Sequence, residues 1–157
     1  MSGVTVRRFR MEDLPALMDV RRSSIRGAAS RDHSPAQIEA WVQTSQDPEA
    51  QARRFSEESI TWVALAGGTP AGFTNLAEDG YVDSMYVHAD HQARGVATAL
   101  LAALEAEARA LGLTRLHSEV SLTARPFFER RGFVVVTPQR VTVNGETYDN
   151  FKMEKML

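Results

Sequence analysis

The sequence predicts a single mixed α/β (α+β) domain in which strands and helices form layers. Its 157 residues, 43% of them hydrophobic and 24% charged, have the size and composition of one ordinary globular domain. Segments with alternating apolar residues are interspersed with segments of helical periodicity, which favours a sheet covered by helices. No repeat, low-complexity block or linker divides the chain. We therefore expect residues 1–157 to form one domain.

The first part of the chain predicts one strand followed by two or three helices. Val4 to Phe9 alternates and is rich in β-branched residues, as strands are. Asp13-Leu14-Pro15 then opens an apolar pattern at helical spacing that stops at Gly27. Ser34-Pro35-Ala36-Gln37 is a capping box with proline at the first helical position, so a second helix begins there. Thr44 to Ser59 is polar but indicates a further helix start rather than a linker.

The middle of the chain predicts an antiparallel meander of three strands. Ile60 to Ala66 and Pro70 to Leu76 are strand-like runs joined by Gly67-Gly68, a composition that suits a tight hairpin turn. A third run, Tyr81 to Val87, follows after a short acidic turn.

The last part predicts two helices and three strands. Gly95 to Leu111 is the strongest helical pattern, rich in alanine and stopped by Gly112. The elements expected after it are a strand over Leu116 to Val120, a short helix over Thr123 to Arg131, and a hairpin of Phe133 to Val143 with Thr147 to Met156 around Asn144-Gly145.

The composition excludes several classes of function. The absence of cysteine excludes a disulfide framework and a thiol nucleophile, and it fits a reducing compartment, so we expect a cytoplasmic protein. A net charge of −2 offers no positive excess for binding nucleic acid. The four histidines lack metal-ligand spacing, so we expect no metal. No stretch approaches about 18 apolar residues, so we expect neither a membrane span nor a signal peptide.

One segment has a composition that suits a phosphate-binding site. Gln92-Ala93-Arg94-Gly95-Val96-Ala97 has the pattern Q-x-x-G-x-A and precedes the long helix. The first N–H groups of a helix lack partners inside the helix and carry the positive end of its dipole, so they favour anions. The segment lacks the Gly-Lys-Ser/Thr ending of a Walker loop and the three glycines of a dinucleotide fingerprint. Small residues at a helix start also serve packing alone, and the pattern by itself leaves both interpretations open.

The position of this segment identifies a family resemblance. It follows the third antiparallel strand and precedes the longest helix, and a second block, Ala124 to Phe133 (A-R-P-F-F-E-R-R-G-F), comes after the next strand. Both blocks resemble those of the GNAT superfamily of acyltransferases, whose hallmark is Q/R-x-x-G-x-G/A at this place. Ser34 to Trp41 and Asn150 to Lys155 further resemble the YafP-like bacterial acetyltransferases. The resemblance covers nearly the whole chain.

The resemblance implies a GNAT-like, mostly antiparallel central sheet of about six to seven strands with helices on both faces. It also implies acetyl-CoA as cosubstrate, bound in a cleft where the strands Tyr81 to Val87 and Leu116 to Val120 splay apart. Relatives often have Asn at the position of Ser121, so this contact differs here. The cofactor-binding residues implied in this way are Met85, Val87, Gln92, Ala93, Arg94, Gly95, Val96, Ala97, Thr98, Ser121, Ala124 and Phe127.

The reaction implied by the resemblance is direct attack of a primary amine, on a small molecule or peptide, at the thioester. The amide of Met85 would stabilise the oxyanion, beside a β-bulge. Asp83 could act as a base through water, or be an ordinary hydrogen-bonded strand residue. Many relatives have a tyrosine acid at the position of Phe128, which has no proton to give. We expect Tyr86, with Tyr81 and Tyr148 as alternatives, to replace it.

The sequence leaves open alternatives for the function of the protein and for its contacts with ligands and partners. The loss of the usual tyrosine at Phe128 also fits a non-catalytic acyl-CoA-binding or sensing module, and the generic helix start fits an unrelated phosphate-binding protein. Arginines of the second block, Arg125, Arg130 and Arg131, could meet the 3′-phosphate of the cofactor or be solvated surface charges. We expect acceptor specificity to lie at Ser23, Ser24 and the loop Arg26 to His33. A homodimer is expected only by analogy.

Overall fold

The computed structural model describes residues 3–157. In this part of the chain the strands and helices follow one another in the predicted order. Met1 and Ser2 of the expected domain lie outside it. The elements are β1 (Val4–Arg8), η1 (Met11–Asp13), α1 (Leu14–Gly27), η2 (Ala28–Arg31), α2 (Pro35–Val42), α3 (Pro48–Ser56), β2 (Ile60–Ala66), β3 (Thr69–Leu76), β4 (Val82–Val87), η3 (Ala89–His91), α4 (Val96–Ala110), β5 (Arg115–Ser121), α5 (Arg125–Arg130), β6 (Val134–Val143) and β7 (Glu146–Met156).

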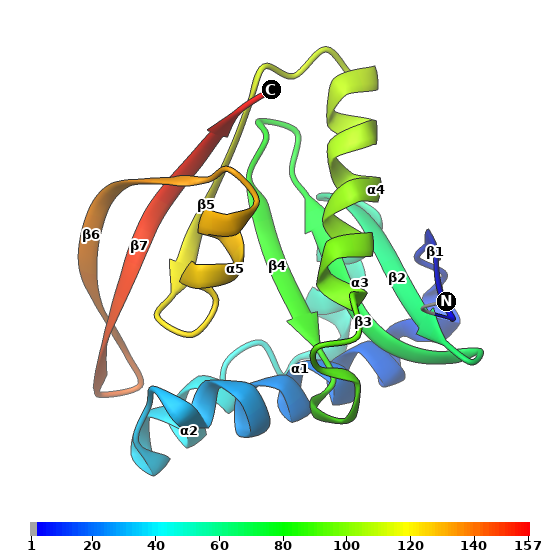
Figure 1. The fold of residues 1–157 in the computed structure, drawn as a ribbon. Coiled ribbons are helices and arrows are strands. Elements are labelled where there is room, and N and C mark those ends of the chain that lie inside the picture. Colours follow the sequence, from blue (N-terminus) through cyan, green and yellow to red (C-terminus); the bar gives the residue numbers. More distant parts are fainter. Residues whose placement is uncertain (1–2) are drawn as a thin grey trace.

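The strands form two antiparallel sheets, which together make the mostly antiparallel, splayed arrangement of strands that was expected. The first has the order β1-β2-β3-β4 and the second the order β5-β7-β6. Between them, β4 and β5 run parallel and meet at one bridge, Tyr81 with His117. Figure 1 shows the two strands diverging from that end like the arms of a V. The strand number and the antiparallel meander are as predicted, and the split is the splayed cleft that the resemblance implied.

A β-bulge lies where the two strands separate. Asn75 of β3 pairs with Ser84 and Leu76 pairs with Val82, so Asp83 of β4 is an extra residue without a partner position in β3. A bulge bends the strand that carries it and increases its twist. The bend therefore turns β4 away from β5 beyond the bridge.

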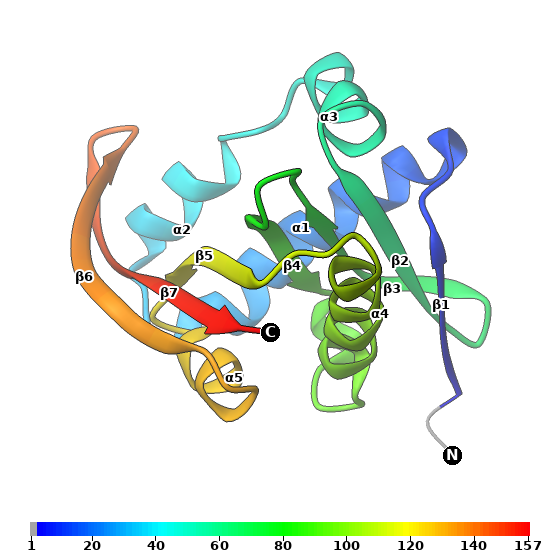
Figure 2. The same ribbon diagram turned by 90° about the horizontal axis from the view of Figure 1, so that it is seen from above.

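Helices cover both faces of the first sheet, as expected (Figure 2). Because side chains alternate along a strand, Trp62 and Ala64 of β2 pack with Leu100 of α4. Val63, between them, packs on the other face with Leu17 of α1.

A single apolar cluster supports both sheets from behind the cleft. Val82 of β4, Leu116 and Val120 of β5, and Phe128 of α5 all belong to the cluster that contains the leucines of α4. The burial of these apolar side chains is the main contribution that stabilises the packing of the two sheets. The V is therefore fixed by close packing rather than by strand pairing.

Gly80 allows the two sheets to approach at their junction. It has φ +92°, and a Cβ placed on it would lie 2.4 Å from the carbonyl oxygen of Arg115. Its own carbonyl accepts a hydrogen bond of 3.0 Å from the backbone N–H of His117. Only glycine has both the conformation and the small size that this position needs.

We predict that Gly80→Ala weakens the junction. Gly68 is the matched control, since it has φ +82° but a Cβ there would meet nothing within 4 Å. Gly68→Ala introduces only the backbone strain of a positive φ, about 1–2 kcal/mol, whereas Gly80→Ala adds overpacking of about 1–3 kcal/mol. Urea unfolding of both variants measures the difference, and equal losses of unfolding free energy would contradict the close approach.

Candidate functional site

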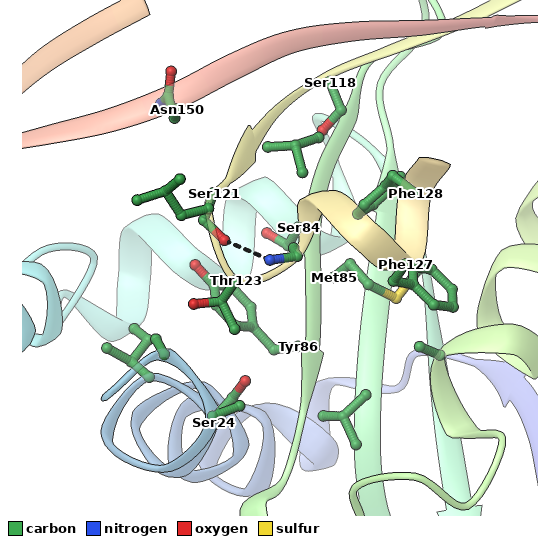
Figure 3. Close-up of a pocket in the computed structure, with 18 of the residues that line it drawn as sticks. Ser24, Ser84, Met85, Tyr86, Ser118, Ser121, Thr123, Phe127, Phe128 and Asn150 are labelled. Carbon is green, nitrogen blue, oxygen red and sulfur yellow. Dashed lines mark hydrogen bonds between the residues drawn. The ribbon is translucent and has the colours of Figure 1, made fainter. Parts of the chain in front are cut away.

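A cleft of about 1090 Å³ opens between the diverging strands β4 and β5. Its walls also include the start of α4, the helix α5, the segment from α1 to α2, and the hairpin of β6 and β7. Figure 3 shows labelled residues from several of these elements around it. They are Ser24, Ser84, Met85, Tyr86, Ser118, Ser121, Thr123, Phe127, Phe128 and Asn150.

The edge of β4 presents backbone groups to this cleft. His88 donates its backbone N–H to the carbonyl of Ala71 in β3, and alternate residues of an antiparallel strand point the same way. The N–H groups of Met85 and Val87 therefore point away from β3, toward the cleft. The side-chain amide of Gln92 donates to the carbonyl of Val87 over 2.7 Å, which agrees with this orientation. These are the two strand residues that the resemblance singled out.

The start of α4 forms the opposite end of the cleft and has the features of an anion site. Gly95, its N-cap, has φ +81° and makes no side-chain capping bond, and a Cβ placed there would meet nothing within 4 Å. Ala93 also has a positive φ, 59°. Successive N–H groups in such a turn converge on a common point and bind anions. The space and the donors therefore fit a phosphate group.

Arginine side chains add positive charge near this helix start. Arg131 donates to the hydroxyl of Thr98 over 2.6 Å, and its guanidinium lies 5.3 Å from the ring centre of Phe127. Arg130 also lines the cleft, whereas Arg125 pairs with Glu129 outside it. Of the three arginines considered from the sequence, Arg131 thus stands beside the anion site, and Arg130 lines the cleft.

The structure brings almost all the predicted cofactor-binding residues to one cleft. Arg94 is the exception, since it is exposed and does not line the wall. The residues that do line it are Met85, Val87, Gln92, Ala93, Gly95, Val96, Ala97, Thr98, Ser121, Ala124 and Phe127.

Ser121 has a local structural partner. Its hydroxyl accepts a hydrogen bond of 3.1 Å from the backbone N–H of Ala124, shown as a dashed line in Figure 3. This bond fixes the turn that leads into α5. The serine thus shapes the wall of the cleft where many relatives have an asparagine.

The candidate acids differ in how their side chains are placed. Phe128 is 3% exposed and packs edge-on against Phe133, so this position serves the core. Tyr148 donates its hydroxyl proton in a hydrogen bond of 2.6 Å to the carbonyl of Gln37, so this proton is already engaged. Tyr86 lines the cleft, and no hydrogen bond of its hydroxyl is found within residues 3–157. Tyr86 is therefore the tyrosine best placed to give a proton.

Asp83, the candidate base, is paired with a cation. Its carboxylate lies 3.0 Å from the guanidinium of Arg54 on α3 and accepts a longer bond of 3.4 Å from Asn75. The charge of Asp83 is thus partly compensated before any ligand binds. No local pattern in the sequence predicts this partner, because Arg54 belongs to a helix far from β4 in the chain.

Tyr81 lies at the closed end of the cleft beside two carboxylates. Burial, together with the negative charges of Glu119 and Asp83, raises the pKa of Tyr81 to about 12. Its phenol is therefore protonated throughout the physiological range, so it cannot act as a base there.

One side of the cleft is formed by the segment from α1 to α2, where acceptor specificity was expected. The sequence identified its residues only in part. Ser24 and Arg31 to His33 line it, as expected, but Ser23 does not, since its hydroxyl accepts from the N–H of Ala89. Trp41 of α2 is also part of the wall.

Three hydrogen bonds join α2 to the β6–β7 hairpin on this side. One is the bond from Tyr148 to Gln37, and the side chain of Gln37 in turn donates to the carbonyl of Thr147 over 2.7 Å. The third runs from Asn144 to the carbonyl of Ala40 over 3.0 Å. Such contacts span about a hundred residues of chain, and no local sequence signal could have found them.

The histidines take no part in a metal-binding arrangement. Among residues 3–157, no three His, Cys, Asp or Glu side chains are grouped so that they could hold a metal ion. His88 accepts a hydrogen bond from the N–H of Asp90 in its own turn. In the same described part, none of the helices has the length and apolar character needed to cross a membrane.

Comparisons with known proteins agree with this geometry. A family model described as an acetyltransferase (GNAT) domain matches residues 29–156. The uncharacterized N-acetyltransferase YafP of Escherichia coli (strain K12) is 34% identical over 153 residues, which are 98% of this chain and 96% of that protein. A GCN5-related N-acetyltransferase from Rhodopseudomonas palustris has a TM-score of 0.94 and 35% identity, covering 100% of this chain and 98% of its own.

More distant structures share the fold. The PaiA N-acetyltransferase of Thermoplasma acidophilum, solved with coenzyme A, has a TM-score of 0.80 at 22% identity over 98% of this chain and 99% of its own. YncA of Salmonella typhimurium, solved with acetyl-CoA, has a TM-score of 0.76 at 20% identity over 99% of this chain and 94% of its own.

We predict that the raised pKa of Tyr81 links stability to alkaline pH. The phenol ionises near pH 10 in the unfolded chain and near 12 in the folded one, so its stabilising contribution is complete below about pH 10 and declines as the pH rises to 12. Tyr81→Phe should therefore cost unfolding free energy at about pH 8 and less at about pH 11. Urea unfolding at both pH values tests this, and a pH-independent difference would contradict it.

Proposed function

The chain belongs to the GNAT family of acetyltransferases, and we propose that it transfers the acetyl group of acetyl-CoA to a primary amine of a small molecule or peptide. The observation that carries the proposal is the pairing of two features across one cleft. The open edge of β4 presents the N–H groups of Met85 and Val87, and the uncapped start of α4 presents an anion site. A thioester with a phosphate-bearing tail needs both kinds of group.

The residues present fit acetyl-CoA as cosubstrate. The N–H groups of the turn from Gln92 to Thr98 would hold the pyrophosphate, and Arg130 or Arg131 the remaining phosphate. Ala124 and Phe127 line the wall along which the pantetheine arm would lie. Two structural neighbours were solved with coenzyme A and with acetyl-CoA, which supports the choice of this ligand.

The chemistry we propose is direct attack of the amine on the thioester. The N–H of Met85 would donate to the oxygen on which negative charge develops, a contribution that elsewhere is worth roughly 10²–10³ in rate. A thiol with a pKa near 8.5 is a tolerable leaving group without an acid, and Tyr86, which lines the cleft, would protonate it. Phe128 cannot do so, since it belongs to the core.

The phenylalanine at position 128 is also compatible with one competing function. A chain that had lost its acid could bind an acyl-CoA without transferring the acyl group, and it would act as a sensor. The competing function predicts cofactor binding but no thiol release with any amine, so the two functions separate in one assay.

We predict that acetyl-CoA stabilises the protein through the site at Gly95. At 100 times its dissociation constant, acetyl-CoA should add about 2.7 kcal/mol and raise the thermal midpoint by about 5–10 °C. Gly95→Asp should abolish the rise, because a carboxylate about 4 Å from a phosphate costs about 4 kcal/mol near a protein surface. The measurement is thermal unfolding with acetyl-CoA, and with ATP and NAD at matched ionic strength as controls.

Gly95→Asn is the matched variant. Asparagine has the shape of aspartate and tolerates a positive φ, but it carries no charge, so it should keep most of the rise. A panel of primary amines, assayed by thiol release, then tests transfer without background, because the chain contains no cysteine. An equal rise with ATP, or one that survives Gly95→Asp, would overturn the cofactor assignment.

A further inference from the structure

Three aromatic side chains meet in the wall of the cleft beside α2. The imidazole of His33 lies edge-on to the indole of Trp41, with ring centres 5.4 Å apart, and its centre is 6.0 Å from that of Tyr148. Trp41 and Tyr148 in turn contact each other edge-on at 6.2 Å. All three line the cleft, and none of them is among the residues assigned to acetyl-CoA. They therefore belong to a part of the cleft that the proposed cofactor site leaves free.

One ring nitrogen of His33 is fixed by the backbone. Its Nδ1 lies 2.8 Å from the carbonyl oxygen of Ala29. A carbonyl oxygen can only accept a hydrogen bond, so Nδ1 carries a proton and donates it. In a neutral imidazole the other nitrogen then has no proton and is an acceptor. The bond to the backbone thus determines that Nε2 is the accepting atom of this side chain.

No group within residues 3–157 donates a hydrogen bond to Nε2 of His33. The hydroxyl of Tyr148 donates to the carbonyl of Gln37 instead, and no hydrogen bond joins the indole N–H of Trp41 to the imidazole in the described chain. His33 is only 9% exposed, yet its Nε2 is not one of the polar atoms that the fold encloses completely without a partner. This nitrogen is therefore open to the cleft that the residue lines.

The residues on either side of His33 are anchored, so the imidazole is held in place. Asp32 accepts a hydrogen bond of 2.8 Å from the hydroxyl of Thr123, which lies in the turn between β5 and α5. Ser34 is the N-cap of α2, and its hydroxyl accepts from the backbone N–H of Gln37 over 3.1 Å. A group held in this way needs little reorganisation to bind a ligand, which favours discrimination between ligands.

We propose that His33 is a specificity-determining residue whose Nε2 accepts a hydrogen bond from a hydroxyl or amide N–H that the acceptor amine carries besides its reacting nitrogen. This inference rests on the proposed function and names the class of acceptor. A molecule that fills this side of the cleft displaces solvent from Nε2, so it must offer a donor in exchange. The rings of Trp41 and Tyr148 suit an apolar carbon body next to that donor. The favoured acceptor is thus an amine with an apolar body and a second hydrogen-bond donor.

Two variants of His33 separate the roles of its two nitrogens. His33→Asn places an amide N–H close to the position of Nδ1, so it keeps a donor for the carbonyl of Ala29 and loses the acceptor at Nε2. His33→Gln reaches the position of Nε2 with its amide oxygen, so it keeps an acceptor toward the cleft and loses the bond to Ala29. Each variant is thus the matched control of the other.

The test compares primary amines in pairs that differ in one donor group, assayed by thiol release. The pairs are ethanolamine with propylamine, glycinamide with isobutylamine, and tyramine with para-methylphenethylamine. In at least one pair the unaltered protein should prefer the member with the donor, and His33→Asn should reduce this preference in kcat/KM roughly 10- to 100-fold. His33→Gln should keep most of it. Because the preference is a ratio within one pair, differences in amine basicity cancel when the variants are compared.

A purely structural role for His33 predicts the opposite order of the two variants. His33→Gln leaves the carbonyl of Ala29 unpaired and should lower the thermal midpoint by roughly 2–10 °C, whereas His33→Asn should lower it less. The nitrogen resonances of the imidazole test its tautomer without any substrate, and their loss in His33→Asn identifies them. At about pH 8.5, where ordinary histidines are neutral, Nε2 should give the chemical shift of an unprotonated nitrogen.

Each other outcome counts against a specific proposal. A proton on Nε2, a preference for the donor in none of the pairs, or a preference that survives His33→Asn would overturn the assignment of His33 alone. An equal loss for both members of every pair would do the same, since it would indicate a role at the reacting nitrogen or in structure. Thiol release with none of the amines by the unaltered protein would overturn the proposed transfer, and the assignment of His33 would fall with it.

Discussion

The separation of β4 from β5 is the constraint on which the rest of the site depends. If these parallel strands stayed paired, the N–H groups of Met85 and Val87 would be used in the sheet. A buried N–H without a partner is costly, so an edge that stays open needs either solvent or a ligand. Here one bridge and a bulge at Asp83 end the pairing, and the apolar cluster behind the strands holds them apart. The cleft is thus built into the fold and requires no rearrangement to exist.

The same geometry separates the charges of the site. The positive end of α4, together with Arg131, lies at one end of the cleft, while Asp83 and Glu119 lie where the strands meet. Opposite charges at two ends of one cavity orient a ligand with phosphates and exclude it from the other end. A cationic amine would be drawn to the carboxylates by the same field. Under the proposed function, the two substrates would therefore reach the reacting carbon from different sides, without competing for one subsite.

Local patterns in the sequence predicted the elements well because each pattern has a local cause. Gly67-Gly68, the capping box at Ser34 and the alternation in β2 act over a few residues, and the structure confirms all three. Local patterns did not predict the split of the sheet, since it depends on which strands pair across the chain; only the family resemblance implied it. For the same reason local patterns predicted neither the bond from Arg54 to Asp83 nor the bonds from α2 to the hairpin.

The burial of Phe128 bears on which proton transfer the site must support. An alkyl ammonium has a pKa near 10.4, so at about pH 7 only about one molecule in 10³ is neutral, which corresponds to about 4–5 kcal/mol. The thiol product has a pKa near 8.5 and leaves as a thiolate at a smaller cost. Removing the proton from the amine is therefore the harder of the two requirements. The site gives the tyrosine position to packing, and it holds the carboxylates of Asp83 and Glu119 at the closed end of the cleft, where a cationic amine would meet negative charge.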